Sequence, residues 1–134
     1  MPELYPAGAP YRDQLLPLAA DLGRRLLPAF DSPSGIPYGT VNLRHGVSSS
    51  ESEVASTAGA GSLALEFGVL SMLTGDQRYA RLAYGAAQRL FSARSAAGLV
   101  GKHVNIRSLG WTERTAGIGY NADSYYGAIG TRLT

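Results

Sequence analysis

The sequence predicts a mainly α-helical chain with one short β-hairpin, and three observations favour this fold class. Residues 11–27 and 77–92 repeat their apolar side chains at the 3.6-residue period of an amphipathic helix. Between them, residues 57–73 are apolar around most of the helical circumference, which is typical of a helix inside a core. Residues 99–106 and 111–113 alternate on either side of a glycine-containing turn, which indicates two paired strands.

The composition fits one globular domain and excludes several kinds of site. The chain has 134 residues, of which 45% are hydrophobic and 16% are charged. Twelve basic and ten acidic residues are scattered rather than clustered, so no nucleic-acid partner is expected. The sequence has no cysteine, which excludes disulfides and thiolate metal sites. No stretch of about 18 apolar residues is free of glycine and charge, and the first residues do not resemble a signal peptide.

The N-terminal part of the chain is predicted to hold one helix between irregular segments. Residues 1–10 contain three prolines and form an irregular lead-in. Pro17 should either kink the first helix or mark the first turn of its more regular part, and Pro28 should end the helix. Residues 36–47 are expected to form an extended loop with at most a short edge strand, and the polar residues 48–56 are expected to be exposed.

The apolar segment and the helix after it are predicted to form an antiparallel hairpin. Thr57 is a candidate N-cap for a helix that runs to Leu73, and Gly75 supplies its left-handed C-terminal residue. Asp76 then caps the helix over residues 77–92. Because the connection has only three residues, the two helices should lie antiparallel.

The end of the chain is predicted to be a loop followed by a short helix. Residues 115–121 are too rich in glycine for a regular element, and the helix that starts near Ala122 should end within a turn or two. Three helices cannot enclose residues 57–73 on all sides. Full burial of that segment therefore implies a core that extends into missing sequence or into a partner.

Glu66 is the first candidate site residue because it is a lone charge among apolar neighbours. No other Asp, Glu, Lys or Arg occurs between Glu53 and Asp76. A carboxylate buried there would need a partner or would hold its proton near neutral pH, and a carboxyl group that holds a proton can act as a general acid. The alternative is that Glu66 packs at a helix end or pairs with an arginine.

Asp123 is the second candidate because it opens the last helix beside Tyr125 and Tyr126. The alternative is an ordinary N-cap or first-turn residue. Two carboxylates in a site lined by tyrosine and tryptophan suit glycoside hydrolysis, which needs an acid for the leaving oxygen and a base for water. The two histidines, His45 and His103, have no ligand-spaced partners, so no zinc site is predicted.

Three separated segments of the sequence resemble one enzyme family. They are Leu-Leu-Pro-Ala-Phe-Asp-Ser-Pro-Ser-Gly-Ile-Pro-Tyr-Gly-Thr-Val-Asn-Leu-Arg-His-Gly-Val (26–47), Ser-Thr-Ala-Gly-Ala-Gly-Ser-Leu-Ala-Leu-Glu-Phe-Gly-Val-Leu-Ser-Met-Leu-Thr-Gly-Asp (56–76) and Ala-Gly-Ile-Gly-Tyr-Asn-Ala-Asp-Ser-Tyr-Tyr (116–126). Over residues 11–126 the chain is similar to the class I alpha-mannosidases of glycoside hydrolase family 47. The resemblance is strongest to the ER degradation-enhancing (EDEM-like) branch.

This resemblance implies a partial (α/α) barrel, that is, the first helical hairpins of a larger ring. It also implies hydrolysis of terminal alpha-1,2-linked mannose from high-mannose N-glycans, with inversion, in glycoprotein quality control in the endoplasmic reticulum. The family motifs place the general acid at Glu66 and a carboxylate that activates or positions water at Asp123. A calcium cofactor is implied as well, with its direct protein ligand outside this chain.

The sequence departs from the family pattern at Gly127, where the resemblance implies a glutamate. Residues 11–126 are therefore interpreted as the N-terminal part of an alpha-mannosidase catalytic domain, and residues 127–134 as a divergent tail. The chain by itself is predicted to be inactive and unstable. Targeting to the endoplasmic reticulum, or association with a membrane, would require segments that this sequence lacks.

Two other functions remain open at this point. A mannose-binding, lectin-like protein would retain sugars without cutting them, and it would have no turnover to lose when Glu66 is replaced by glutamine. A helical-repeat interaction module would need a second copy of the hairpin over residues 57–92, and the sequence shows no second copy.

Overall fold

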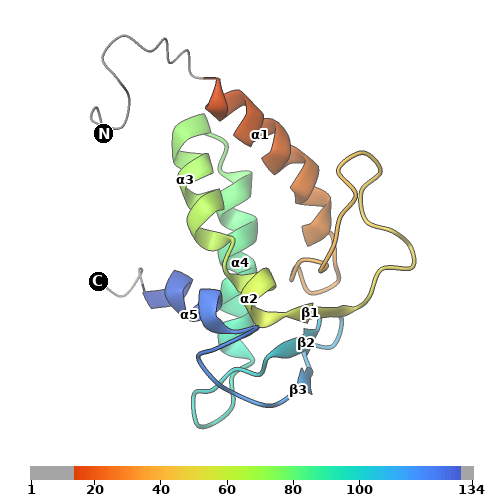
Figure 1. Ribbon diagram of the computed structural model, residues 1–134, viewed down its shortest axis with the longest axis vertical. Coiled ribbons are helices and arrows are strands. Elements are labelled where there is room, and N and C mark those ends of the chain that lie inside the picture. Colours follow the sequence, from red (N-terminus) through yellow and green to blue (C-terminus); the bar gives the residue numbers. More distant parts are fainter. Residues whose placement is uncertain (1–13, 131–134) are drawn as a thin grey trace.

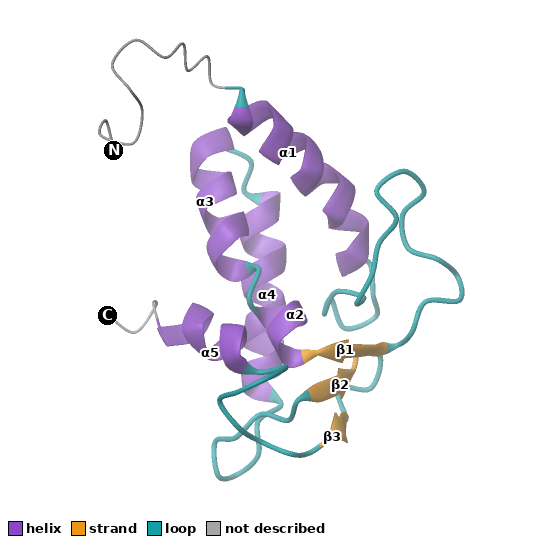
Figure 2. Ribbon diagram, in the orientation of Figure 1, coloured by secondary structure: helices purple, strands orange, loops and turns teal. Residues whose placement is uncertain are grey.

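The computed structural model of the chain describes residues 14–130, in which helices pack together above a small sheet (Figure 1). In chain order the elements are α1 (Leu15–Leu26), the 3-10 helix η2 (Leu27–Phe30), β1 (Val54–Ser56), α2 (Thr57–Gly61), α3 (Ala64–Thr74), α4 (Arg78–Ser92), β2 (His103–Asn105), β3 (Trp111–Glu113) and α5 (Asp123–Gly130). Figure 2 shows α1, α3 and α4 side by side, with the sheet, α2 and α5 at one end of them. The predicted lead-in (residues 1–10) and the second half of the predicted tail (residues 131–134) lie outside the described residues.

Helix α1 confirms the predicted amphipathic helix over its described part. Pro17 lies in the first turn, where its missing N–H removes no intrahelical hydrogen bond. Pro28 does not end the helical path at once, because the chain continues through the 3-10 turn η2. Gly23 lets α1 approach its neighbours closely, since a Cβ there would lie 2.6 Å from Leu70 Cδ2 and 3.0 Å from Tyr79 Cε1.

The predicted single helix over residues 57–73 is wrong, because the structure divides it into α2 and α3. The N-cap of α2 is Ser56, whose Oγ accepts a hydrogen bond from the Gly59 N–H at 3.0 Å. Thr57 is buried instead, and its Oγ1 donates to the Gly101 carbonyl oxygen at 2.6 Å. The glycines of α2 have low helix propensity, which weakens the helix just before the break at residues 62–63.

Helix α3 is buried on one side only, in agreement with the expectation that the other helices of this chain cannot enclose it on all sides. Its buried face packs on α4 and α1, and includes Phe67 and Leu70. The opposite face exposes apolar side chains, with Val69 at 55% and Met72 at 82% of their full exposure. Because both faces are apolar in the sequence, the pattern could not show which of them lies uncovered in residues 14–130.

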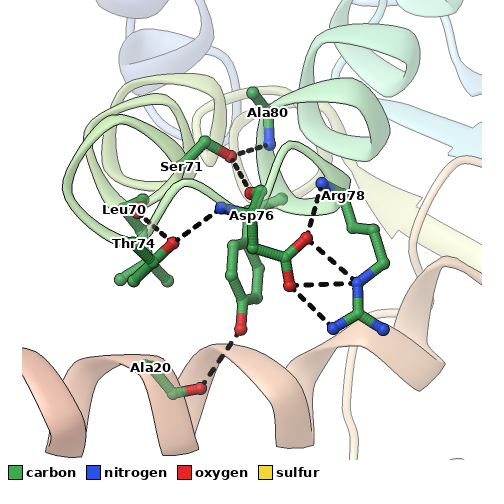
Figure 3. Close-up of polar contacts among 8 residues, drawn as sticks. Ala20, Leu70, Ser71, Thr74, Asp76, Arg78 and Ala80 are labelled. Carbon is green, nitrogen blue, oxygen red and sulfur yellow. Dashed lines mark hydrogen bonds and ion pairs between the residues drawn. The ribbon is translucent and has the colours of Figure 1, made fainter.

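The predicted α3–α4 hairpin is confirmed, and its turn is held by side chains (Figure 3). Gly75 ends α3 with a φ of +76°, a conformation that favours glycine. The structure places the N-cap of α4 at Gln77 rather than at the predicted Asp76, although Asp76 Oδ1 accepts from the Arg78 N–H at 3.0 Å. The hydrogen bond from the Arg78 side chain lowers the pKa of the Asp76 carboxyl. The buried Ser71 Oγ donates to the Asp76 carbonyl oxygen at 2.7 Å and accepts from the Ala80 N–H at 2.9 Å.

Replacing Ser71 by alanine is expected to lower the free energy of unfolding by about 1–3 kcal/mol, because it leaves a carbonyl oxygen and an N–H without their partner. Urea unfolding followed by circular dichroism measures this change. The control is Ser92→Ala, which removes only a hydrogen bond from an exposed hydroxyl to the Gln88 carbonyl oxygen of the same helix. Equal effects of the two substitutions would contradict a special role for Ser71.

The predicted β-hairpin is confirmed with shorter strands, and it belongs to a three-stranded antiparallel sheet of order β1-β2-β3. Ala55 pairs with Val104, and His103 pairs with Glu113 across a β-bulge. Strand β1 was not predicted, because residues 48–56 were expected to be exposed. Ala55 is only 3% exposed, and three residues paired to a distant segment leave too short a pattern to recognise.

Two apolar clusters follow one another along α4, one packed on its N-terminal and middle part and one at its C-terminal end. One joins α1, α3 and α4 and contains Phe30, Phe67, Leu70, Tyr79, Ala83 and Ala86. The other joins the sheet to α2, α4 and α5 and contains Ile36, Ala55, Ala60, Leu90, Val100, Val104, Ile106 and Tyr125. The loop over residues 36–47 carries one isolated bridge, Asn42 to Gly46, as a mostly irregular segment would. Its first residue, Ile36, anchors it in the second cluster.

By length and composition alone, residues Thr57–Thr74 are long and apolar enough to cross a membrane. The segment is divided between α2 and α3, and 44% of it is buried inside the structure. It also carries Phe67 and Leu70 of the first apolar cluster. We therefore interpret it as part of the core.

Candidate functional site

Glu66 lies in the first turn of α3, and its side chain is exposed. It stands in a groove of about 430 Å³ between α1 and α3, where all the other lining residues are apolar or glycine. The expectation that Glu66 is buried is wrong for the described residues, because the groove is open on the side that α1 does not cover. Among residues 14–130, no hydrogen bond or ion pair holds Glu66, so the alternative of an arginine partner is not observed either.

Asp123 is the first residue of α5, and it is also exposed. Its Oδ1 accepts a hydrogen bond from the Ser124 N–H at 2.9 Å, and its own N–H donates to the Gly119 carbonyl oxygen at 3.0 Å. Just before it, the carbonyl oxygen of Asn121, which has a φ of +70°, accepts from the Ala58 N–H at 2.8 Å. These contacts tie the start of α5 to α2 and leave the second carboxylate oxygen of Asp123 available to a ligand.

The two candidate carboxylates both lie in the first turn of a helix, but they do not line the same cavity. Asp123 does not line the groove that contains Glu66. Within the described residues, the structure therefore presents two separate exposed carboxylates rather than one closed pair.

Of the two tyrosines that follow Asp123, Tyr125 is buried in the second apolar cluster and Tyr126 packs against that cluster. Tyr125 is 1% exposed, and its ring packs against Gly61, where a Cβ would lie 2.3 Å from Tyr125 Cδ2. Tyr126 meets it edge to face at 5.5 Å between ring centroids. Burial raises the pKa of the Tyr125 hydroxyl to about 12. Sequence reasoning placed these rings beside a sugar cavity, but Tyr125 instead fixes α5, and thus Asp123, onto α2.

The buried Tyr125 should make the stability of the chain depend on pH in alkaline solution. An unfolded tyrosine loses its proton near pH 10.0, whereas the folded one keeps it to about pH 12. Between these values the unfolded state binds fewer protons, so the free energy of unfolding falls with rising pH by up to about 1.4 kcal/mol per pH unit. Urea unfolding at several pH values measures this slope.

The slope should flatten in Tyr125→Phe and persist in Tyr120→Phe, since Tyr120 is 80% exposed. An equal slope in the two variants would show that burial of Tyr125 is not its source.

The described residues do not offer a metal centre. No group of three or more His, Asp or Glu side chains in residues 14–130 could hold a metal ion. His103 Nδ1 instead lies 2.7 Å from Glu113 Oε2, as a cross-strand pair of the sheet, and His45 is exposed in the turn that follows Asn42. The described residues therefore do not fit the calcium ion that the resemblance implies.

Comparison with known proteins gives a consistent set of matches. The profile of glycosyl hydrolase family 47 matches residues 4–129. "Alpha-mannosidase I MNS4" of Arabidopsis thaliana is 52% identical over 116 residues, which are 87% of this chain and 19% of that protein. "ER degradation-enhancing alpha-mannosidase-like protein 2" of Homo sapiens is 48% identical over 120 residues, which are 90% of this chain and 21% of that protein.

A solved structure matches as well. The alpha-1,2-mannosidase from Trichoderma reesei superposes with a TM-score of 0.77 at 32% identity, over 85% of this chain and 24% of that one. That protein is an α/α barrel, so the helical part of this chain is a portion of such a barrel. The chain spans only about a fifth to a quarter of the length of these relatives.

Proposed function

Because the chain belongs to glycosyl hydrolase family 47, we propose that it forms the N-terminal part of the catalytic domain of an alpha-mannosidase. The observation that carries this proposal is the family match over residues 4–129, which includes both candidate carboxylates. The proposed reaction is hydrolysis of terminal alpha-1,2-linked mannose from high-mannose N-glycans with inversion. The relatives include an alpha-1,2-mannosidase and ER degradation-enhancing alpha-mannosidase-like proteins, which supports this substrate and a location in the endoplasmic reticulum.

The proposed mechanism needs two carboxyl groups with a water molecule between one of them and the sugar. An inverting glycosidase separates these groups by roughly 6.5–9.5 Å, one to protonate the leaving oxygen and one to activate the water. We assign the water-activating or water-positioning role to Asp123, whose unpaired carboxylate oxygen is free to accept a proton or a hydrogen bond.

The general acid is assigned to Glu66, and this role depends on further structure. In residues 14–130 the groove is open, so burial does not keep a proton on Glu66. A segment that covers the apolar face of α3 would exclude water from the groove and would favour the protonated form. Such a cover would also bury Val69 and Met72, which are exposed here.

The chain by itself is proposed to be inactive for the same reasons. Its two carboxylates do not line one cavity, and its described residues offer no metal centre. Calcium, if the complete enzyme uses it, would be held by residues that this chain does not supply.

A chimera tests the proposed function. Residues 11–126 replace the matching segment of the Arabidopsis relative, and mannose release from a high-mannose glycan is measured. The chimera is expected to release mannose, whereas the 134-residue chain is not. A chimera that folds but releases no mannose would overturn the proposal. Mannose release by the 134-residue chain alone would contradict the statement that this chain is inactive by itself.

A further inference from the structure

A second cavity lies beside the β-hairpin, and its lining differs from that of the groove at Glu66. Its volume is about 470 Å³, within the range of small-molecule sites. Its walls include Leu99, Val100, Gly101, Leu109, Trp111 and Arg114. It thus joins an apolar wall, one large aromatic ring and one guanidinium group, which is the mixture that small-molecule sites use.

The indole ring of Trp111 is fixed before any ligand arrives. Its Nε1 donates to the Ala93 carbonyl oxygen at 2.8 Å, so the polar edge of the ring is already paired. Gly101 lies against the ring, and a Cβ at that position would come within 2.7 Å of Trp111 Cε3. Only glycine permits this approach, and a ring held in this way loses little conformational entropy on binding.

Arg114 supplies the polar part of the same cavity. It is exposed, and it makes no hydrogen bond or ion pair with the residues that the structure describes. A guanidinium group carries five N–H donors and no acceptor. Its donors are therefore available to the oxygen atoms of a ligand that rests on the ring of Trp111.

A hexose uses both parts of this lining. The C–H groups on one face of a sugar ring carry partial positive charge and pack on the negative face of an indole, while its hydroxyl oxygens accept hydrogen bonds. A free phosphate would use Arg114 but would leave Trp111 and the apolar wall without a contact. We propose that this cavity binds one hexose unit of a glycan, separately from the groove that contains Glu66; the choice of mannose among the hexoses rests on the proposed function.

The test uses Trp111 itself, because it is the only tryptophan of the chain. Alpha-1,2-linked mannobiose, methyl alpha-mannoside and inorganic phosphate are titrated into the 134-residue chain, and tryptophan emission is recorded. The two sugars should change the emission saturably, with dissociation constants of about 1 mM, as expected for ligands with few contacts. Phosphate should not. The proposal would be overturned if the emission of the folded chain changed with phosphate alone. It would also be overturned if the emission changed with none of the three ligands.

Two variants show whether the cavity is the binding site. Arg114→Gln should weaken sugar binding at least about tenfold, since it removes a charged donor. Arg81→Gln is the matched control, because Arg81 is exposed on α4 and does not line the cavity. Equal affinities of the two variants would place the sugar elsewhere and contradict the proposal.

The same comparison can be made in the chimera if the isolated chain does not fold. There, calorimetry is done in an Asp123→Asn background, so that the sugar is not cleaved. If the chimera released no mannose but Arg114→Gln still weakened sugar binding, the proposed reaction would fail and this inference would stand. Hydrolysis without any effect of Arg114 on binding would overturn the inference alone.

Discussion

In the chimera, Asp123→Asn is expected to lower the turnover number by about 10²–10⁴, because an amide cannot accept the proton of the attacking water. The Michaelis constant should change much less, since an amide of the same shape keeps the contact with the sugar or the water. Initial rates of mannose release over a range of glycan concentrations measure both constants.

Asp31→Asn is the matched control, because Asp31 is exposed at the end of η2 and should leave both constants unchanged. Glu66→Gln should also lower turnover while glycan affinity is retained. If Asp123→Asn kept full turnover, Asp123 would be an ordinary first-turn residue of α5, and the assignment of the base would fail.

Replacing Gly61 by alanine is expected to lower the free energy of unfolding by about 3 kcal/mol. The new Cβ would lie 2.3 Å from Tyr125 Cδ2 and 3.0 Å from Leu90 Cδ1. Both side chains are buried in the cluster between the sheet, α2 and α5, so neither can move without opening the core. Urea unfolding followed by Trp111 emission gives the free energy, because that ring packs against the same cluster.

The control is Gly85→Ala in the interior of α4. There the new Cβ would meet only the end of the Arg89 side chain, at 2.9 Å, which can move away. Alanine is the better helix former by about 1 kcal/mol, so this variant should be at least as stable as the original chain. A destabilisation as large as that of Gly61→Ala would mean that loss of glycine, and not a clash with Tyr125, is responsible.

The sequence predicted the helices well wherever one face of a helix decides the pattern. Helices α1 and α4 carry arginines on one side and apolar residues on the other, so their type and approximate ends followed from periodicity. The turn at Gly75 and Asp76 also followed to within one residue, because a left-handed glycine and a carboxylate that accepts from the Arg78 N–H act locally.

The misses share a physical cause, which is that the deciding contact lies far away in the sequence. The hydroxyl of Thr57 donates to the Gly101 carbonyl oxygen, and the N-cap of α2 is Ser56 instead. Strand β1 exists because it pairs with β2. Neither contact can be recognised from the local pattern of apolar and polar residues.

The candidate site shows the same limit. The sequence identified Glu66 as a lone charge among apolar residues, and the groove confirms those neighbours. The number of helices indicated that this segment is not fully enclosed, but the sequence could not show that Glu66 lies on the open side, because burial depends on which segments pack on α3. The cavity at Trp111 was missed as well, although a single tryptophan next to a turn and followed by an arginine was a visible signal.

The pairing of Ala55 with Val104 has a kinetic consequence. The α3–α4 hairpin can form from neighbouring segments, whereas the sheet must wait until the chain between its strands has closed into a loop. We therefore expect refolding to proceed in two stages, with amides of α4 protected from exchange before those of β1. The start of α5, which carries Asp123, would be positioned only in the later stage, because it is attached to α2 directly after β1.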